Sequence, residues 1–330
     1  MSNSGLVNFG CTCYFNTAIQ CMFNVKLFRD FVLKQEELPT SATLMLELQS
    51  LFQDMDMSST FSSSVSPHNM LNTIKISMGS LMEIDEQNDI QEFTVMFLDK
   101  LNACISHQLH RSELLHHIDL SNNLAAPAYT RFLAGLAANW FISHKKEYSN
   151  LIDVFYGQQT NQIQCGQCNH ISHVCETFVC LPLSFNESPT IESMLADYMK
   201  HEILDGRTCD ACKTQCDGTK MHKISRMPQT LMICIQRFKH SGTVTRKIHT
   251  KVDVPEHLDL NDFAIHNMMR SKYTLASIAC HFGSANNGHY VAVCKHNDMW
   301  FAYDDTNCHK LKGYDEIDAS TYYMMVYERD

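Results

Sequence analysis

A glycine-punctuated segment near the N-terminus contains a candidate thiol nucleophile. The run Gly5-Leu-Val-Asn-Phe-Gly-Cys-Thr-Cys13 leads from a loop into a helical pattern that begins near Cys13. Unpaired N–H groups and the positive end of the dipole at a helix N-terminus stabilise a negatively charged sulfur. We therefore interpret Cys13 as the nucleophile in preference to Cys11, which lies in the loop. Asn8 supplies an amide that could face the oxyanion formed when sulfur attacks a carbonyl.

A second segment, near the C-terminus, supplies a candidate general base and a group to orient it. Residues 288–305 read as two β-strands joined by a tight polar turn, which we place between His296 and Asn297. A symmetric turn there sets His289 directly opposite Asp304, with Cβ atoms about 5 Å apart on one face. A carboxylate at that distance can hold an imidazole in one tautomer. We predict His289 as base and Asp304 as orienting partner, provided that no bulge shifts the register.

Two C-x-x-C pairs in the middle of the chain predict a metal site. They are Cys165 with Cys168 and Cys209 with Cys212. Four thiolates suit tetrahedral Zn²⁺ and leave no open position, so we predict a structural zinc ion. Cys216 is a spare ligand candidate that ranks below Cys212, because the two pairs already supply four sulfurs. A redox dithiol and a nucleic-acid-binding zinc ribbon are the alternatives, although no βαβ pattern surrounds the pairs.

Charge and composition narrow the classes of partner. Acidic residues outnumber basic ones 36 to 26, which gives the 330-residue chain a net charge of -10. Nucleic-acid binding usually requires a basic face, so we expect a protein or small-molecule partner and no nucleic acid. The sequence has no signal-peptide pattern and no long apolar run, so we expect no membrane partner. Fifteen cysteines, an odd number, favour reduced thiols and a cytoplasmic or nuclear location.

The elements that must position these residues differ between the two halves of the chain. Up to about Tyr148, apolar residues recur at helical spacing, and we also assign residues 105–140 to helix and residues 58–67 to a loop. After about Phe155, short β-like runs dominate the pattern. They cover residues 177–183, 231–238, 277–282, 289–294 and 322–327. The sequence thus predicts an α+β fold with helices first and sheet afterwards.

Taken together, the two terminal segments resemble the cysteine and histidine boxes of the ubiquitin-specific protease family, which are papain-like cysteine deubiquitinases. Those boxes run approximately G-L-x-N-x-G-x-T-C-Y-x-N-x-x-x-Q and G-H-Y-x-A…W…F/Y-D-D, and every fixed position is filled here. The resemblance implies Cys13 as nucleophile, His289 as general base and Asp304 as the third member. It also implies Asn8 as oxyanion donor. Asp305, which would point to the other face if its strand continues, is a secondary hydrogen-bonding candidate.

A further motif falls in the order seen in that family. The stretch Q-N-D-I-Q-E-F, which begins at Gln87, resembles a family element whose acidic residues meet the basic C-terminal tail of ubiquitin. On a helix, Asp89 and Glu92 are three residues apart and share a face, which suits an arginine-bearing peptide. The resemblance also implies that Gln87, Gly288 and Tyr290 contact the substrate.

For the whole chain, the resemblance implies one catalytic domain at residues 5–329 after a short lead at residues 1–4. Its hand-like fold would have a helical thumb over about residues 5–150, with a β-rich palm and zinc-tipped fingers over about residues 151–329. The implied enzyme is a thiol-dependent deubiquitinase that hydrolyses the isopeptide or peptide bond after the C-terminal glycine of ubiquitin or a ubiquitin-like modifier. Two alternatives stay open: a catalytically inactive ubiquitin-binding module and a general papain-like peptidase.

Overall fold

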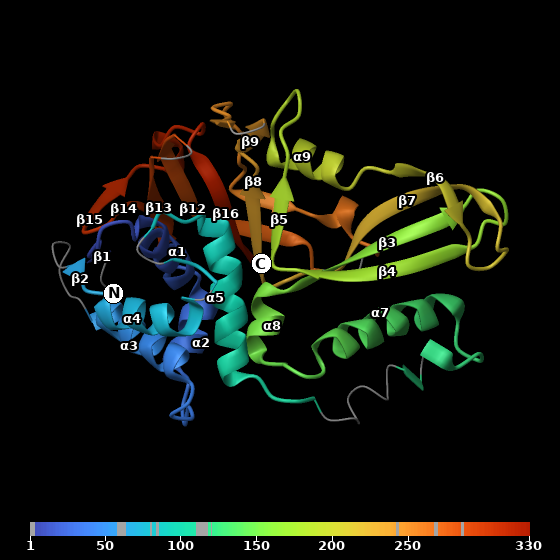
Figure 1. Cartoon of the computed structure of the whole chain (residues 1–330), viewed down its shortest axis with the longest axis horizontal. Helices are drawn as coiled ribbons and strands as arrows, with labels where there is room; N and C mark the ends of the chain where they lie inside the picture. Colours follow the sequence, from blue (N-terminus) through green and yellow to red (C-terminus); the bar gives the residue numbers. More distant parts are fainter. Residues whose placement is uncertain are drawn as a thin grey trace.

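The computed structural model describes residues 4–57, 64–79, 81–83, 86–109, 118–119, 121–241, 244–266, 270–284 and 287–330. Helices fill the first part of the chain, and two sheets account for most of the second part (Figure 1). The larger sheet packs beside the helices, whereas the smaller one projects away from them. Within the described ranges, no helix is both long enough and apolar enough to cross a membrane.

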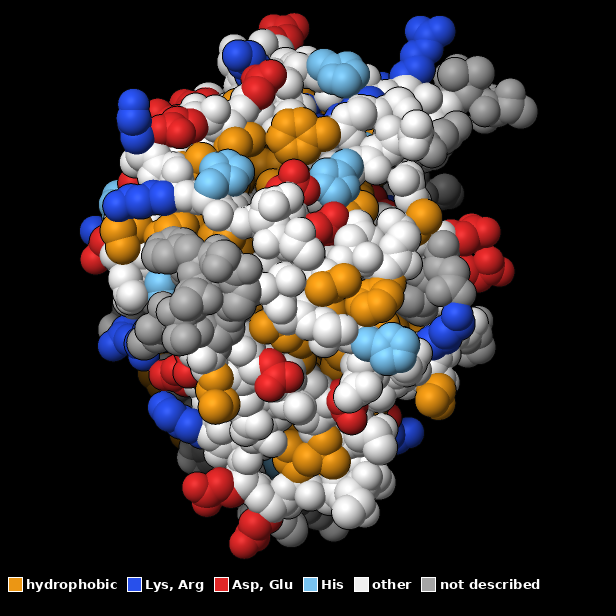
Figure 2. All heavy atoms as spheres, turned by 90° about the vertical axis from the view of Figure 1, so that its left-hand side faces the viewer, with side chains coloured by type: hydrophobic (Ala, Val, Ile, Leu, Met, Phe, Trp, Pro, Cys, Tyr) orange, Lys and Arg blue, Asp and Glu red, His pale blue; other side chains and the backbone are white. Residues whose placement is uncertain are grey.

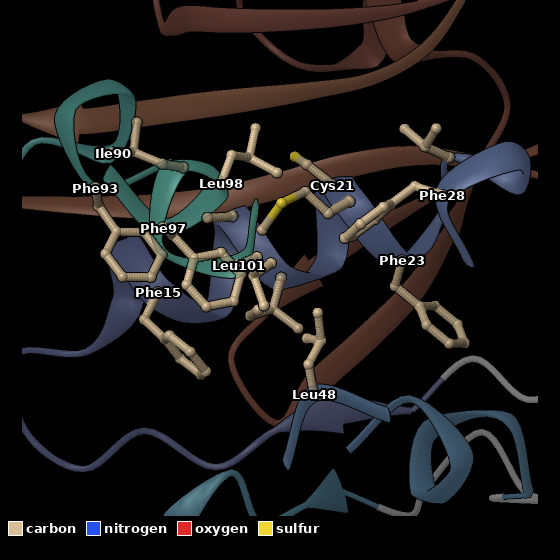
Figure 3. Close-up of a cluster of buried hydrophobic side chains, with 14 of the residues drawn as sticks. Phe15, Cys21, Phe23, Phe28, Leu48, Ile90, Phe93, Phe97, Leu98 and Leu101 are labelled. Atoms are coloured by element: carbon tan, nitrogen blue, oxygen red, sulfur yellow. The ribbon is translucent and has the colours of Figure 1, made fainter. Parts of the chain in front are cut away.

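Five helices form the thumb, and their buried faces confirm the helical spacing predicted from the sequence. They are α1 (Cys13–Phe23), α2 (Lys26–Leu33), α3 (Thr43–Met57), α4 (His68–Met78) and α5 (Ile90–Ile105). Every residue of α1 is buried, because this helix lies between other helices and the larger sheet. Figure 3 shows the surrounding core, in which Phe15 of α1 meets Phe93 of α5 edge-on and Phe93 stacks on Phe97.

The palm is an eight-stranded sheet with hydrophobic side chains buried on both faces. Its order is β15-β14-β13-β12-β16-β8-β5, and β11 also pairs with β12. The strands are β5 (Cys180–Leu183), β8 (Thr230–Ile235), β11 (His257–Asp259), β12 (Lys272–Gly283), β13 (Gly288–His296), β14 (Met299–Asp304), β15 (Asn307–Leu311) and β16 (Tyr322–Arg329). Met324 and Val326 of β16 enter the core shared with the thumb, whereas Met325 and Tyr327 enter the core on the opposite face. On the thumb side, α1 contacts β12, β13 and β14.

A separate four-stranded antiparallel sheet forms the fingers. Its order is β4-β3-β7-β6, with β3 (Gly157–Cys165), β4 (Ile171–Phe178), β6 (Glu202–Thr208) and β7 (Gln215–Arg226). Three helices accompany the sheets. Helix α7 (Ala128–His144) contacts β4, α8 (Asn150–Phe155) contacts β8, and α9 (Ile191–Tyr198) contributes to the core on the palm face opposite the thumb. The hairpin ends of the fingers lie at the tip farthest from the thumb (Figure 1).

Short elements complete the described structure and hold the start of the chain in place. β1 (Gly5–Leu6) pairs with β2 (Ser64–Val65), β9 (Phe238–Ser241) pairs with β10 (Val244–Lys247), and η1 (Asn261–Phe263) and η2 (Tyr314–Glu316) are 3₁₀ helices. The N–H of Leu6 donates to the carbonyl oxygen of Asp305 at 2.8 Å. A Cβ on Gly5 would lie 2.4 Å from that oxygen, so only glycine permits this approach. The cysteine loop is thereby fixed against the histidine-bearing hairpin.

The β13–β14 hairpin differs from the predicted register. Residues 297–298, with φ of 48° and 59°, form its two-residue turn, as type I′ hairpins require. His296 therefore pairs with Met299. The predicted turn, centred one residue earlier, is wrong, and the predicted pairing is wrong by two residues. Because side chains alternate with a period of two, His289 and Asp304 still share a face, as diagonal rather than direct neighbours.

Three of the five predicted strands are confirmed, within β12, β13 and β16. The other two are interrupted, at Val179 between β4 and β5 and at residues 236–237 between β8 and β9. The second break contains Arg237, which is fully buried and donates to four backbone carbonyl oxygens, including that of Tyr322 at 2.5 Å. An alternating hydrophobic pattern cannot reveal such a cation, because its partners are distant backbone groups.

The helix predicted over residues 105–140 is wrong at residues 106–109, whereas residues 118–119 and 121–122 are helical, and residues 110–117 and 120 lie outside the described ranges. Helix α5 is followed by Ser106 with an extended ψ of 153°, and His107 forms an antiparallel bridge with Tyr148. The later part is confirmed as α7. Of the predicted loop at residues 58–67, residues 58–63 lie outside the described ranges, and residues 64–65 form β2 instead.

Candidate active site

Cys13 is the first residue of α1 and follows a loop that is held by its own polar groups. The backbone N–H and the hydroxyl of Thr12 donate to Oδ1 of Asn8, at 3.3 and 3.1 Å. The Thr12 hydroxyl accepts from the N–H of Phe9 at 3.0 Å, and Gly10 supplies a φ of 105° that side-chain-bearing residues rarely adopt. The loop thus presents the Asn8 amide and the Cys13 thiol together at the helix N-terminus.

His289, on β13, contacts both Cys13 and Asp304. Its Nε2 lies 2.6 Å from Oδ1 of Asp304, and the ring also hydrogen-bonds the Cys13 thiol. Because Nε2 is engaged with the carboxylate, Nδ1 is the nitrogen that faces the sulfur. The hydrogen bond with Cys13, aided by the one with Asp304, raises the pKa of His289 to about 9 against the opposing effect of burial. The imidazole is therefore protonated at neutral pH beside the candidate nucleophile.

Asp305 joins the cysteine loop and α1 to the histidine hairpin. Its predicted orientation required the strand to continue, but β14 ends at Asp304 and Asp305 has a φ of 50° in the turn that follows. Its carboxylate accepts hydrogen bonds from Nδ2 of Asn8 and Nδ2 of Asn16, both at 2.8 Å. Its Oδ2 lies 4.0 Å from Nε2 of His289. Asn8 uses one amide N–H for this bond, which leaves the second for another acceptor.

A cavity of about 310 Å³ lies beside the thiol, with walls from both thumb and palm. Its lining residues are Cys13, Tyr14, Gln87, Asn88, Asp89, Phe238, Thr245, His281, Gly288 and Tyr290. Gln87 bridges two walls, since its Nε2 donates to the carbonyl oxygen of Gly288 at 3.2 Å and its Oε1 accepts from the Gly288 N–H at 3.4 Å. A Cβ on Gly288 would lie 2.1 Å from Nε2 of His281, so this wall requires glycine. Four of the five predicted substrate-binding residues therefore line one cavity.

Asp89 and Glu92 do not share a helical face, contrary to the prediction. Asp89 precedes α5 with extended backbone, and its Oδ1 accepts from the N–H groups of Gln91 at 2.8 Å and Glu92 at 3.2 Å. The other oxygen of Asp89 accepts from the Tyr323 hydroxyl. Asp89 is thus the N-cap of α5 as well as a cavity residue. Glu92 is exposed on the first turn of α5, outside the cavity lining.

Asn16 and His281 are among the site residues to which the sequence prediction gave no role. Asn16 follows Cys13 by three residues, so helical spacing places it on the same face and could have indicated it. His281 lies opposite Tyr290 in the β12–β13 pair, with ring centroids 4.6 Å apart. Burial lowers the pKa of His281 to about 4, so this imidazole stays neutral. His281 is one of eighteen histidines in the chain, and no sequence signal separates it from the rest.

Four cysteines gather at the tip of the fingers. The sulfur atoms of Cys165, Cys168, Cys209 and Cys212 all lie within 4.8 Å of one another. Cys165 and Cys212 are 3.9 Å apart, and Cys168 and Cys209 are 3.7 Å apart. A tetrahedral ion with metal–sulfur bonds of about 2.3 Å holds its sulfurs about 3.8 Å apart. The spacing therefore fits a four-thiolate metal site.

The two C-x-x-C turns repeat one backbone geometry. In each turn, the N–H of the first cysteine donates to the carbonyl oxygen of the residue five positions later. The carbonyl oxygen of that cysteine accepts from the N–H of the residue four positions later, and all four bonds are 2.9–3.0 Å long. The residue after the second cysteine, Asn169 or Lys213, has a φ of 58° or 59°. These two like turns face each other from the β3–β4 and β6–β7 hairpins, so their four sulfurs converge.

The face beside the edge strand β15 and its neighbour β14 is mixed in charge. Figure 2 shows the side of the molecule on which these strands lie in Figure 1, with histidine side chains next to acidic ones in its upper half. Lysine and arginine side chains of the described residues are dispersed on this face and form no continuous patch there. This distribution agrees with the excess of acidic residues in the sequence.

The aligned thiol, imidazole and carboxylate are the groups used by thiol-dependent hydrolases of the papain type. The model of the ubiquitin carboxyl-terminal hydrolase family matches residues 4–327, and the chain therefore belongs to that family.

Curated relatives match along nearly the whole chain. Ubiquitin carboxyl-terminal hydrolase Usp2 of Drosophila melanogaster is 28% identical over 98% of this chain and 34% of its own length. The probable ubiquitin carboxyl-terminal hydrolase 4 of Schizosaccharomyces pombe is also 28% identical, over 98% of this chain and 58% of its own. The human ubiquitin carboxyl-terminal hydrolase 2 is 27% identical over 98% of this chain and 55% of its own length. The chain thus spans between about one third and three fifths of these relatives.

Solved structures share the fold. The SAGA Ubp8/Sgf11/Sus1/Sgf73 DUB module bound to ubiquitin aldehyde matches with a TM-score of 0.76 and 20% identity, over 99% of this chain and 69% of that chain. The same module bound to monoubiquitin gives the same values. These matches confirm the predicted α+β fold class, with a helical thumb, a β-rich palm and β fingers.

Proposed function

We propose that this chain is a deubiquitinase that hydrolyses the isopeptide or peptide bond after the C-terminal glycine of ubiquitin. The observation that carries the proposal is the contact of His289 with both Cys13 and Asp304, beside a cavity in a chain of the ubiquitin carboxyl-terminal hydrolase family. The curated relatives are named as such hydrolases, and the similar solved module contains ubiquitin or ubiquitin aldehyde.

The chemistry follows from the placement of these groups. The Cys13 sulfur attacks the carbonyl carbon of the terminal glycine, and the free N–H of the Asn8 amide donates to the oxyanion. His289 gives its proton to the departing lysine amine, which leaves a thioester between Cys13 and ubiquitin. Water then attacks the thioester while His289 takes its proton, and the carbon–sulfur bond breaks to release the glycine carboxylate and return the Cys13 sulfur to the form that attacked. Asp304 keeps the imidazole in one orientation throughout, with Nδ1 toward the sulfur.

The ubiquitin tail fits the cavity between thumb and palm. An extended peptide needs backbone partners, and the Gln87 amide and the Gly288 backbone, which bond to each other across the cavity here, would supply donors and acceptors once the peptide replaces those bonds. The carboxylates of Asp89 and Glu92 would attract the arginine side chains of the tail, Asp89 in the cavity and Glu92 at the exposed surface nearby. Tyr290 completes the wall beside Gly288.

The metal of the finger tip is proposed to be Zn²⁺ with a structural role. Four thiolate donors favour this ion, and they fill a tetrahedral shell so that no position is open for a substrate. The sulfur spacings of 3.7 and 3.9 Å support the proposal. The ion would join the β3–β4 hairpin to the β6–β7 hairpin at the end of the fingers.

A cytoplasmic or nuclear location is also proposed. All fifteen cysteines are free thiols, and such a content of unpaired thiols is typical of reducing compartments. The proposed nucleophile also needs a reduced sulfur in order to react.

Cleavage of a purified isopeptide conjugate tests the proposed function. The wild-type chain should release free ubiquitin from diubiquitin, Cys13→Ala should release none, and Cys11→Ala should retain most of the activity because it leaves the candidate nucleophile in place. Binding of ubiquitin without cleavage would favour an inactive binding module. Equal cleavage of unrelated peptides would favour a general peptidase.

A further inference from the structure

A fifth thiol lies against the four-cysteine site. The Sγ of Cys216 is 3.3 Å from the Sγ of Cys165, closer than the 3.9 Å that separates Cys165 from Cys212. Two thiolates on one tetrahedral zinc ion lie about 3.8 Å apart, so Cys216 is within the distance at which it could share an ion with Cys165. Neither of the two C-x-x-C turns contains Cys216, and the proposed shell of four sulfurs does not use it.

Cys216 is held by strand pairing in the β6–β7 hairpin and lies just outside the second C-x-x-C turn. Cys216 belongs to β7, opposite Arg207 of β6, whereas Cys212 lies in the turn between these strands. The neighbouring residue Asp217 accepts a hydrogen bond at its carbonyl from the N–H of Gly166 at 2.9 Å. That bond ties β7 to the turn that begins at Cys165. Cys216 therefore approaches the site from the side of the first turn, and Cys212 from the side of the second.

We propose that Cys216 is a reserve ligand that completes the thiolate shell when Cys212 is lost or chemically blocked. The inference rests on the proposed zinc site. The Cys216 thiol gives its proton to water, as a thiol ligand does when it binds a metal, and the resulting thiolate binds the ion in the position that Cys212 no longer fills. The ion keeps four thiolates and its charge is unchanged, so the shell stays closed. Cys212 is the neighbour of Cys165, beside which the fifth sulfur lies, whereas Cys209 is the neighbour of Cys168 at 3.7 Å, so we expect Cys216 to replace Cys212 and not Cys209.

Zinc affinity of matched single and double variants tests the proposal. We expect Cys212→Ser to bind one zinc ion with affinity within about tenfold of wild type, and Cys216→Ser to equal wild type. Loss of a ligand without replacement should exceed the roughly 10- to 100-fold cost of losing an outer-shell partner. Cys209→Ser and the double variant Cys212→Ser with Cys216→Ser should therefore weaken zinc binding by more than about 100-fold. Chelator competition measures each value.

Alkylation of the zinc-loaded proteins, read by mass spectrometry, identifies the ligands directly. In wild type, Cys216 should be alkylated, whereas in Cys212→Ser it should be protected by the ion. If the wild type binds zinc but Cys212→Ser binds it as weakly as Cys209→Ser does, the reserve ligand is overturned and the metal site stands. The same conclusion follows if Cys216 is still alkylated in zinc-bound Cys212→Ser. A folded wild type that binds no zinc overturns the metal site itself. Neither result depends on catalytic activity, so the proposed deubiquitinase function is tested separately.

Discussion

At the scale of single residues, the protonation state of His289 sets the pH dependence. The hydrogen bonds with Cys13 and Asp304 raise its pKa from the ordinary 6.5 to about 9, so the imidazolium persists through neutral pH. We predict that kcat/KM falls as pH rises through about 9, where this proton is lost. These bonds also stabilise the folded state. Their contribution is fully present below a pH of about 6.5 and is lost as the pH rises past about 9.

A matched variant checks this assignment. In Asp304→Asn, the loss of the negative charge should move the alkaline limb of the pH–rate profile to lower pH, because one of the causes of the raised pKa is gone. A limb that stays in place in Asp304→Asn would show that the titrating group is not His289.

Asp305 should act mainly by positioning, because its Oδ2 lies 4.0 Å from Nε2 of His289 whereas Oδ1 of Asp304 lies 2.6 Å away. Its carboxylate holds the amides of Asn8 and Asn16, at 2.8 Å each. Asp305→Asn weakens these charge-assisted bonds, and a loss of about 1.5–3 kcal/mol in one of them corresponds to about a 10- to 100-fold drop in kcat. The alkaline limb should stay near that of wild type. Parallel pH–rate profiles of the Asp304 and Asp305 variants separate the two roles. A limb that shifts in Asp305→Asn as it does in Asp304→Asn would contradict the positioning role of Asp305.

At the scale of elements, the β13–β14 turn carries a residue that the backbone tolerates poorly. Asp298 has a φ of 59°, a region that glycine adopts at lower cost than other residues. Asp298→Gly should raise the free energy of unfolding by about 0.5–1 kcal/mol. Asp298→Ala removes the same carboxylate but keeps a Cβ, so it should not stabilise. Thermal unfolding of the two variants measures the difference, and equal effects would show that charge rather than backbone conformation matters.

The same turn shows where sequence reasoning fails at this scale. Alternation and turn residues predict the two strands, but they do not decide which pair of residues forms the turn, and the positive φ at residues 297–298 decides it. His289 and Asp304 nevertheless meet, because the error of two residues preserves the face. The mispredicted region after Ile105 has a different cause. Its backbone bridges to Tyr148, a contact that no helical spacing reveals.

At the scale of the whole molecule, the site exists only because distant segments pack together. Helix α1 lies on β13, which brings Cys13 to His289, and the Gln87–Gly288 contact joins residues 201 apart in the chain. Residue types and local motifs predicted Cys13, His289, Asp304 and the four clustered cysteines. The role of Asp89 as a helix cap, the bond of Asn16 with Asp305 and the contacts of His281 were not predicted, because the partners of these residues depend on which faces meet in the folded chain.

The separation of fingers and site predicts how metal removal acts. The finger tip lies far from the thumb in Figure 1, so loss of the proposed zinc should disorder the tip without disturbing the Cys13 loop. We expect KM for a ubiquitin conjugate to rise by about tenfold, equivalent to about 1.4 kcal/mol of binding. Cleavage of a short peptide that carries only the ubiquitin tail should be unchanged. Equal loss on both substrates after chelation would show that the metal supports the whole fold.

The proposed activity depends on Cys13 as the nucleophile that attacks the carboxyl end of ubiquitin. Covalent capture tests it most directly: the purified chain is incubated with ubiquitin that bears a C-terminal electrophile, beside ubiquitin-like probes of the same chemistry. We expect an adduct with the ubiquitin probe that maps to Cys13, persists in Cys11→Ala and is absent from Cys13→Ala. No adduct from a folded, zinc-loaded chain, or an adduct on another cysteine, would contradict the account.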